Sequence, residues 1–183
     1  MVTRLYLPSS GAPSVSPAFD AAWDVTSGAD RVRAVANGLS GTAMASKATA
    51  ETSATPCNVL SRQYVAGPLK AGEIAGTVKG VIRAQEANAD ADYRAQLVIR
   101  VVSADGATVR GTLRAADGEA LSSEFGTGLA NRAFPLAALS PQALTSVTAQ
   151  AGDWLVVEVG FRSHNEHMTS RNASLRYGDS AAS

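Results

Sequence analysis

Side chains that could ligate a metal gather in the segment His164-Asn165-Glu166-His167, which holds both histidines of the chain. Two histidines three positions apart can bind one ion when a helix carries them. This segment, however, is polar and follows an apolar β-like run, and zinc would also require a third and a fourth ligand. The pattern therefore favours a solvated loop over a metal site, and the sequence predicts no bound metal.

A second group of carboxylates, Glu86, Asp90 and Asp92, lies in one polar segment. These side chains could ligate Ca²⁺, which takes several oxygen ligands from flexible loops. The spacing lacks the Asp-x-Asp-x-Asp-Gly order of a dedicated calcium loop. We therefore interpret the segment as a polar hairpin loop.

The single cysteine, Cys57, provides the one thiol that could act as a nucleophile. It follows Pro56 and precedes a β-like run, and nothing in the sequence places a base beside it, so we expect a small buried apolar side chain. The chain contains no Gly-x-Ser-x-Gly elbow, no phosphate-binding Gly-Lys-Ser/Thr loop and no Cys-x-x-Cys pair. We expect no catalytic and no cofactor-binding residues, and we predict that the protein is not an enzyme.

The charges of the chain balance, with 16 Lys and Arg against 16 Asp and Glu in 183 residues. Neutrality gives no electrostatic argument for nucleic acid, which usually requires a basic face. No apolar run approaches the ~18 residues of a membrane span, and the first residues lack the basic start and apolar core of a signal peptide. The sequence predicts synthesis in a cytoplasm, with neither nucleic acid nor a membrane as partner.

Short β-like runs separated by turn residues occupy the chain from residue 31 onward. Asp105-Gly106 separates two such runs and Asp117-Gly118 closes another. Asp-Gly between apolar runs is a strong hairpin signal, because both positions can adopt positive φ. No stretch keeps a 3.6-residue period over the length of a helix. The expected strands are 31–36, 42–50, 58–66, 73–84, 92–103, 107–115, 129–135, 144–150, 153–162 and 173–178.

Alternation within two of these runs assigns their faces. Between Tyr93 and Val102 the odd-numbered positions are apolar or aromatic, whereas Arg94, Gln96 and Arg100 share the other face with two valines. One apolar and one mixed face are typical of a half-buried antiparallel sheet.

The segment from Ser146 to Gly160 combines an extended stretch, the Gly152-Asp153 turn and a second apolar run. In that run Trp154 and Glu158 lie on the face opposite Leu155 and its apolar neighbours. We interpret this strand as scaffold and its residues as poor candidates for a site.

Strands at ~8–12-residue spacing favour a sandwich or barrel over βαβ units. The predicted fold class is all-β, an antiparallel β-sandwich that is jelly-roll-like and has an irregular N-terminal arm. We expect an N-terminal strand and a Pro/Ser-rich arm over residues 1–30 and the β-sandwich domain over residues 31–183. The short first strand is expected at 2–7, and a long loop that crosses between the sheets at 116–143.

The N-terminal arm carries large apolar side chains in a segment that prolines interrupt. Phe19 and Trp23 need a surface on which to pack, and their spacing with Ala22 would also suit one helical turn. A polar arm with aromatic anchors docks either on its own domain or on another subunit, and both arrangements remain open here. The predicted partner-binding residues are Leu5, Tyr6, Leu7, Phe19 and Trp23.

Seven segments have a distinctive order along the chain. They are Thr3–Gly11, Val15–Trp23, Arg62–Val65, Ile74–Gly80, Arg100–Gly106, Ser146–Asp153 and Leu175–Asp179. This order resembles that of small structural proteins of tailed bacteriophages. The resemblance covers nearly the whole chain, with 24–57 and 116–143 the least distinctive. It brings no catalytic residues, and members of this group usually continue past the last segment.

The resemblance implies a bacteriophage virion protein that decorates or cements a capsid, or is otherwise head-associated, and binds a repeating protein lattice. Its partners would be other virion proteins, either the major capsid protein or tail proteins, in a homo-oligomer or other symmetric assembly. A tail, neck or fibre component is one alternative. A carbohydrate-binding module that recognises host glycans is another, since small β-sandwiches serve both functions. Deletion of residues 1–24 is predicted to abolish assembly onto particles.

Overall fold

A computed structural model describes residues 4–36, 43–49, 56–116, 121–135, 142–163 and 171–178. Within these ranges the chain is all-β, as predicted, and forms no helix. The strands are β1 (Asp30–Arg33), β2 (Ala43–Thr49), β3 (Asn58–Ala66), β4 (Gly72–Val78), β5 (Gly80–Glu86), β6 (Tyr93–Val102), β7 (Val109–Arg114), β8 (Ala130–Phe134), β9 (Gln142–Ala149), β10 (Trp154–Ser163) and β11 (Arg171–Tyr177).

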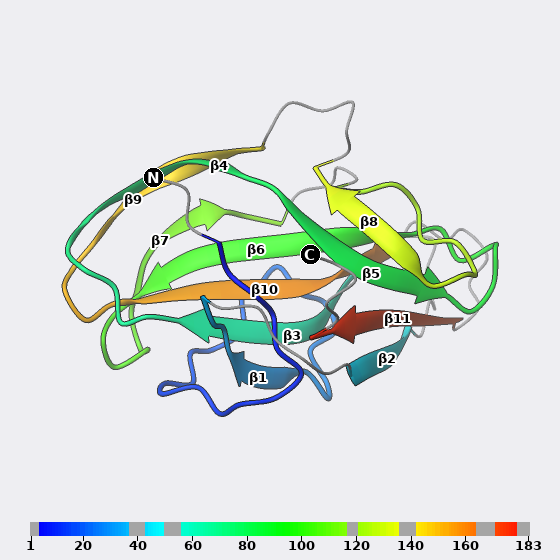
Figure 1. The fold of residues 1–183 in the computed structure, drawn as a ribbon, viewed down its shortest axis with the longest axis horizontal. Coiled ribbons are helices and arrows are strands. Elements are labelled where there is room, and N and C mark those ends of the chain that lie inside the picture. The colour runs from blue at the N-terminus through cyan, green and yellow to red at the C-terminus, as the bar shows by residue number, and fades with distance from the viewer. Residues whose placement is uncertain are drawn as a thin grey trace.

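These strands form three sheets. The largest has the order β1-β3-β10-β6-β7, the second has the order β2-β11-β5-β8, and β4 pairs with β9 in a two-stranded sheet. In Figure 1 the two smaller sheets lie in front of the five-stranded sheet, with β4 and β9 at one end and β5, β8 and β11 at the other.

The main core contains buried side chains from all three sheets. They include Tyr64 from β3, Leu97 and Ile99 from β6, Leu175 from β11 and Val147 from β9. We call the face of the five-stranded sheet that points into this core the inner face, and the opposite face the outer face. The alternation predicted for β6 is confirmed, because its odd-numbered side chains all belong to the main core.

Strand pairing departs from the prediction at β1. β1 runs parallel to β3, with Asp30 opposite Arg62 and Arg33 opposite Val65, whereas the other strand pairs are antiparallel. Parallel neighbours need a crossover of a dozen or more residues. The chain between β1 and β3 is long enough, and it contributes β2 to the second sheet on the way.

The single strand expected at 73–84 is two strands in different sheets. β4 ends at Val78 and β5 starts at Gly80, where the chain leaves β9 and pairs with β8. A Cβ at Gly80 would stand 2.5 Å from Cζ of Phe134, so glycine allows this ring to lie against the backbone at the crossing. Periodicity could not show the change of sheet, because both halves of the run remain extended.

Of the strand expected at 2–7, the structure describes residues 4–7, which form one bridge. In it Tyr6 pairs with Val35 through two backbone hydrogen bonds of 2.8 and 3.3 Å. Pro8 follows directly and has no N–H with which to continue a ladder. In the expected loop at 116–143, Phe125 is fully buried and its N–H donates to the carbonyl of Tyr93. This part of the expected loop therefore contacts the start of β6 at Phe125, whereas Ala130–Phe134 forms β8 and pairs with β5.

Candidate functional site

A charged residue stands in the middle of the five-stranded sheet. Glu158 of β10 lies opposite Gln63 of β3 and Val98 of β6. Its side chain points to the outer face and is fully buried. An ion costs several kcal/mol to bury unless other groups compensate it, so the surroundings must satisfy this carboxylate.

Groups from the sheet and from the N-terminal arm donate to Glu158. Gln63 Nε2 and Arg100 Nη2 approach Oε1 at 2.8 and 2.6 Å. Trp23 Nε1 lies 2.7 Å from Oε2, and the Asp20 N–H lies 3.2 Å from both oxygens. Arg100 also pairs with Asp20, with 3.4 Å between Nε and Oδ2. We call these five residues the arm anchor.

A tight turn in the arm directs Trp23 towards the sheet. The Asp20 carboxylate accepts a hydrogen bond of 2.9 Å from the Ala22 N–H, and the Asp20 carbonyl accepts one of 3.3 Å from the Trp23 N–H. An aspartate that binds the backbone two residues on is a common turn-former. The spacing that suggested a helical turn therefore produces a turn without a helix.

The indole ring of Trp23 fills a small apolar cluster on the outer face. It is 5% exposed and packs with Leu60 and Val98. Below it lies Gly160, at a β-bulge where the register between β10 and β3 shifts. A Cβ at Gly160 would stand 2.0 Å from the Val59 carbonyl oxygen and 2.8 Å from Cζ3 of Trp23. Only glycine fits beneath the arm at this position.

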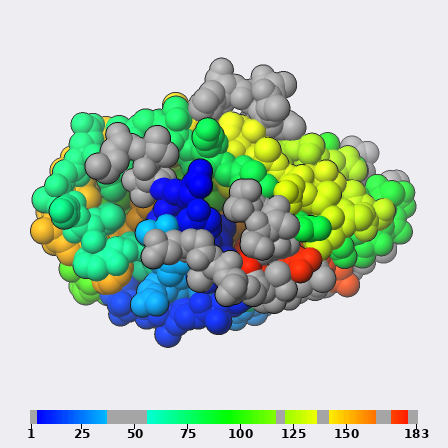
Figure 2. Space-filling model, viewed as in Figure 1, coloured from blue at the N-terminus to red at the C-terminus, as the bar shows by residue number. Residues whose placement is uncertain are grey.

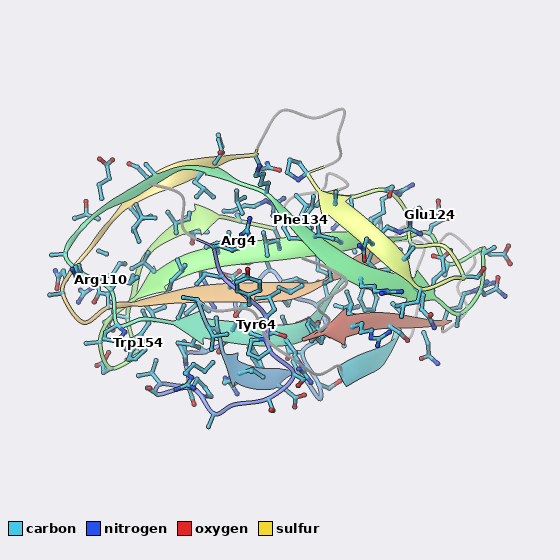
Figure 3. All side chains as sticks on the ribbon, in the orientation of Figure 1. Arg4, Tyr64, Arg110, Glu124, Phe134 and Trp154 are labelled. Carbon is cyan, nitrogen blue, oxygen red and sulfur yellow. The ribbon has the colours of Figure 1, made fainter. Side chains whose placement is uncertain are left out.

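The first part of the arm lies on the inner face. Figure 1 shows this segment crossing in front of β6, β10 and β3, and Figure 2 shows its atoms in blue near the middle of the same face. Leu5 and Leu7 pack against the main core. The Pro8 carbonyl accepts a hydrogen bond from the hydroxyl of Tyr64, labelled in Figure 3. Since later arm residues reach the outer face, the arm covers parts of both faces.

All five predicted partner-binding residues make contacts within their own chain. Trp23 belongs to the arm anchor, Leu5 and Leu7 to the edge of the main core, and Tyr6 to the bridge with Val35. Phe19 packs on the Trp23 cluster, and the Arg31 guanidinium stacks over its ring at 3.9 Å. Of the two arrangements left open by the sequence, the structure has the arm docked on its own domain. Partner contact through these residues stays a prediction.

The carboxylates considered for calcium do not converge on one point. Glu86 is buried and accepts a hydrogen bond of 3.4 Å from the Tyr93 N–H, while Asp90 pairs with Arg171 at 3.2 Å. Burial, together with the nearby Glu124 and Asp92 charges, raises the pKa of Glu86 from 4.5 to about 7. Across the described ranges no three metal-ligating side chains gather. His164, Glu166 and His167 lie outside the described residues.

Cys57 is half-buried and packs against the main core, in a less enclosed position than the sequence predicted.

Sequence reasoning did not identify Gln63, Arg100 and Glu158 as a cluster. A signal was present, because polar residues interrupt apolar runs in three separate strands at positions that share one face. A charge inside an apolar β-run requires a partner, and that requirement would have pointed to the cluster.

The arm anchor is suited to holding the arm in place. Both oxygens of Glu158 receive hydrogen bonds from the chain itself, and the side chain has no exposed surface for a ligand to reach.

No family model and no curated protein matches this sequence. In the part of the chain that the structure describes, no helix is long and apolar enough to cross a membrane.

Proposed function

We propose that this chain is a structural protein of a tailed-bacteriophage virion that decorates or cements the capsid by binding a repeating protein lattice. The observation that carries the proposal is the ordered series of segments that resembles such proteins. Most of these segments fall on the scaffold: Arg62–Val65 lies in β3, Arg100–Gly106 in β6 and its turn, and Ser146–Asp153 in β9 and its turn.

The proposed architecture is a jelly-roll-like sandwich. Its support is the main core, to which the five-stranded and the four-stranded sheet both contribute side chains. The arm wraps from the inner to the outer face and is held there by the arm anchor, so arm and sheets form one body. A body of this kind binds a lattice through its surface, at contacts that the symmetry of the particle repeats.

The part of the arm that faces solvent is the proposed contact with the lattice. Ser10, Ala12, Ser14 and Ser16 are exposed, whereas Trp23 is buried. Deletion of residues 1–24 is a poor test of this contact, because it removes Trp23 and Asp20 from Glu158 and is expected to destabilise the whole fold. Point substitutions at the exposed positions leave the arm anchor intact.

Binding of the purified protein to particles that lack it tests the proposal. We expect Ala12→Glu combined with Ser14→Glu to lower occupancy at least tenfold, because two charges would be placed in a repeated interface. Ala133→Glu, at an exposed position of β8, is the matched control. Full occupancy by the arm variant would contradict the arm contact.

Mass spectrometry of purified virions distinguishes the alternatives. Hundreds of copies per particle would support decoration, whereas a handful would indicate a tail, neck or fibre part. Absence of the chain from virions together with binding to a defined sugar on a glycan array would replace the proposal with a carbohydrate-binding function.

A further inference from the structure

The edge strands of the sheets differ in how well they are protected. An unpaired edge offers N–H and C=O groups to another strand, and proteins block it with charges, prolines or covering segments. At β1 the arm covers part of the edge, because the Arg33 N–H donates to the Gly11 carbonyl at 2.8 Å. At β8 the charged Arg132 lies mid-strand and Pro135 follows the strand.

β4 has no proline and no described covering segment, although its register with β9 shifts between Ile74 and Gly76. Among the described strands it pairs with β9 alone, which leaves its other edge open. Its seven residues include one charge, Glu73, and no proline. A Cβ at Gly72 or Gly76 would meet nothing within 4 Å, so no described atom lies over the strand face at these two positions. Ile74 and Val78 pack towards the core, whereas Ala75 and Thr77 are exposed.

Two charges flank the centre of this strand symmetrically. Glu73 precedes Gly76 by three positions and Lys79 follows it by three. Both side chains are exposed, and neither forms an ion pair with another described residue. An identical antiparallel strand related by a twofold axis at Gly76 would face each Glu73 with the second copy's Lys79.

We propose that the open edge of β4 pairs antiparallel with β4 of a second copy of this chain, about a twofold axis at Gly76. The two symmetric Glu73–Lys79 contacts select this register, since other registers lose them. Ala75 then faces the second copy's Thr77, and these small side chains allow the backbones to approach. The contact is isologous, so each open edge covers the other and growth stops at two copies.

The pairing extends the proposed function by naming one partner, a second copy. A seven-residue edge buries less than the ~1,200 Å² of a standard interface, so the isolated protein is expected to dimerise weakly. Copies held side by side on a particle have a high effective concentration, which strengthens a weak contact.

Sedimentation of the isolated full chain over a concentration series tests the pairing. We expect Glu73→Lys and Lys79→Glu, each alone, to raise the dimer dissociation constant roughly tenfold, because two attractive contacts become repulsive. The double variant restores both contacts with the charges exchanged, and its dissociation constant should return towards that of the native chain. A purely local role of these residues would not produce rescue.

Cysteine cross-linking tests the register directly. In a Cys57→Ser background, mixing Ala75→Cys with Thr77→Cys should give a disulfide-linked heterodimer, whereas Ala75→Cys alone should give little cross-linking. A chain that stays monomeric at millimolar concentration overturns the proposal, as does a dimer insensitive to both charge variants. Because these assays use the free protein, their failure leaves the particle-binding test unaffected.

Discussion

At the scale of single residues, the outer face of the central strands holds charged and polar side chains that are buried. Gln63, Arg100 and Glu158 come from three neighbouring strands. Gln63 and Glu158 are fully buried, and Arg100 is 4% exposed. Their remaining partners, Asp20 and Trp23, come from the arm. The sheet therefore depends on the arm to complete its hydrogen bonds, which couples the folding of the arm to that of the sheet.

Removing one member of this cluster tests the coupling. Glu158→Ala leaves Arg100 buried with only Asp20 as an acidic neighbour, and loss of one partner from a buried ion pair typically costs ~3–5 kcal/mol of unfolding free energy. Replacing both charges, with Glu158→Leu and Arg100→Met, should recover part of this loss because no unpaired ion remains. Urea unfolding measures the free energy of unfolding of both variants.

The control for this comparison is Glu73→Ala, which removes an exposed carboxylate and should change stability by no more than about 0.5 kcal/mol. A loss below about 1 kcal/mol for Glu158→Ala would show that the arm anchor contributes little to the fold. A double variant less stable than Glu158→Ala would show instead that side-chain packing, not charge, decides the result.

At the scale of elements, β10 is shaped by the arm that crosses it. The register between β10 and β3 shifts at the Val159/Gly160 bulge, and the Trp23 ring lies over the glycine. A bulge bends its strand and re-aims the side chains that follow. The position of Gly160 therefore links the geometry of a central strand to the docking of a segment more than a hundred residues earlier.

Gly160→Ala is expected to be among the most damaging small substitutions in the chain. The new methyl group would meet a backbone oxygen at 2.0 Å, which a side-chain rotation cannot relieve. Overpacking typically lowers the free energy of unfolding by ~1–3 kcal/mol, and a clash with the backbone is expected at the upper end of that range. Urea unfolding measures this loss. Gly128→Ala is the matched control, since its added Cβ meets nothing within 4 Å. Equal stability of the two variants would contradict the tight fit under the arm.

The elements that could be predicted are those that a local pattern in the sequence determines. Alternation placed the side chains of β6 on the correct faces, because a strand must alternate. It did not show that the mixed face is buried, since a polar residue looks the same in sequence whether water or an arm covers it. The parallel pairing of β1 and the division at Lys79 depend on distant segments, and no local pattern reports them.

At the scale of the whole molecule, Glu86 lies where the sheets meet. It ends β5 of the four-stranded sheet, its carboxylate accepts from the first N–H of β6 in the five-stranded sheet, and its own N–H donates to the Gly126 carbonyl. Its side chain is 2% exposed, and burial raises its pKa from 4.5 to about 7. Protonation of this group therefore affects the global free energy of unfolding.

The direction of the pH dependence follows from the raised pKa. Below about pH 4.5 the folded and the unfolded chain both hold the proton, so Glu86 contributes its full stability there. Between about 4.5 and about 7 the unfolded chain releases the proton first, and the free energy of unfolding falls as pH rises. The loss is complete above about pH 7 and amounts to ~3 kcal/mol at 1.36 kcal/mol per pKa unit.

Glu86→Gln isolates this contribution. Glutamine keeps an oxygen that can accept from the Tyr93 N–H but carries no charge at any pH, so the variant should match the native chain near pH 4 and exceed its stability by ~3 kcal/mol near pH 8. Urea unfolding at half-unit steps between pH 4 and 8 measures the difference, from which titrations common to both proteins cancel. Glu73→Gln, at an exposed position of β4, should follow the native curve throughout. Parallel curves for Glu86→Gln and the native chain would mean that Glu86 is ionised in the folded protein across this range, and that the junction of the sheets tolerates its charge.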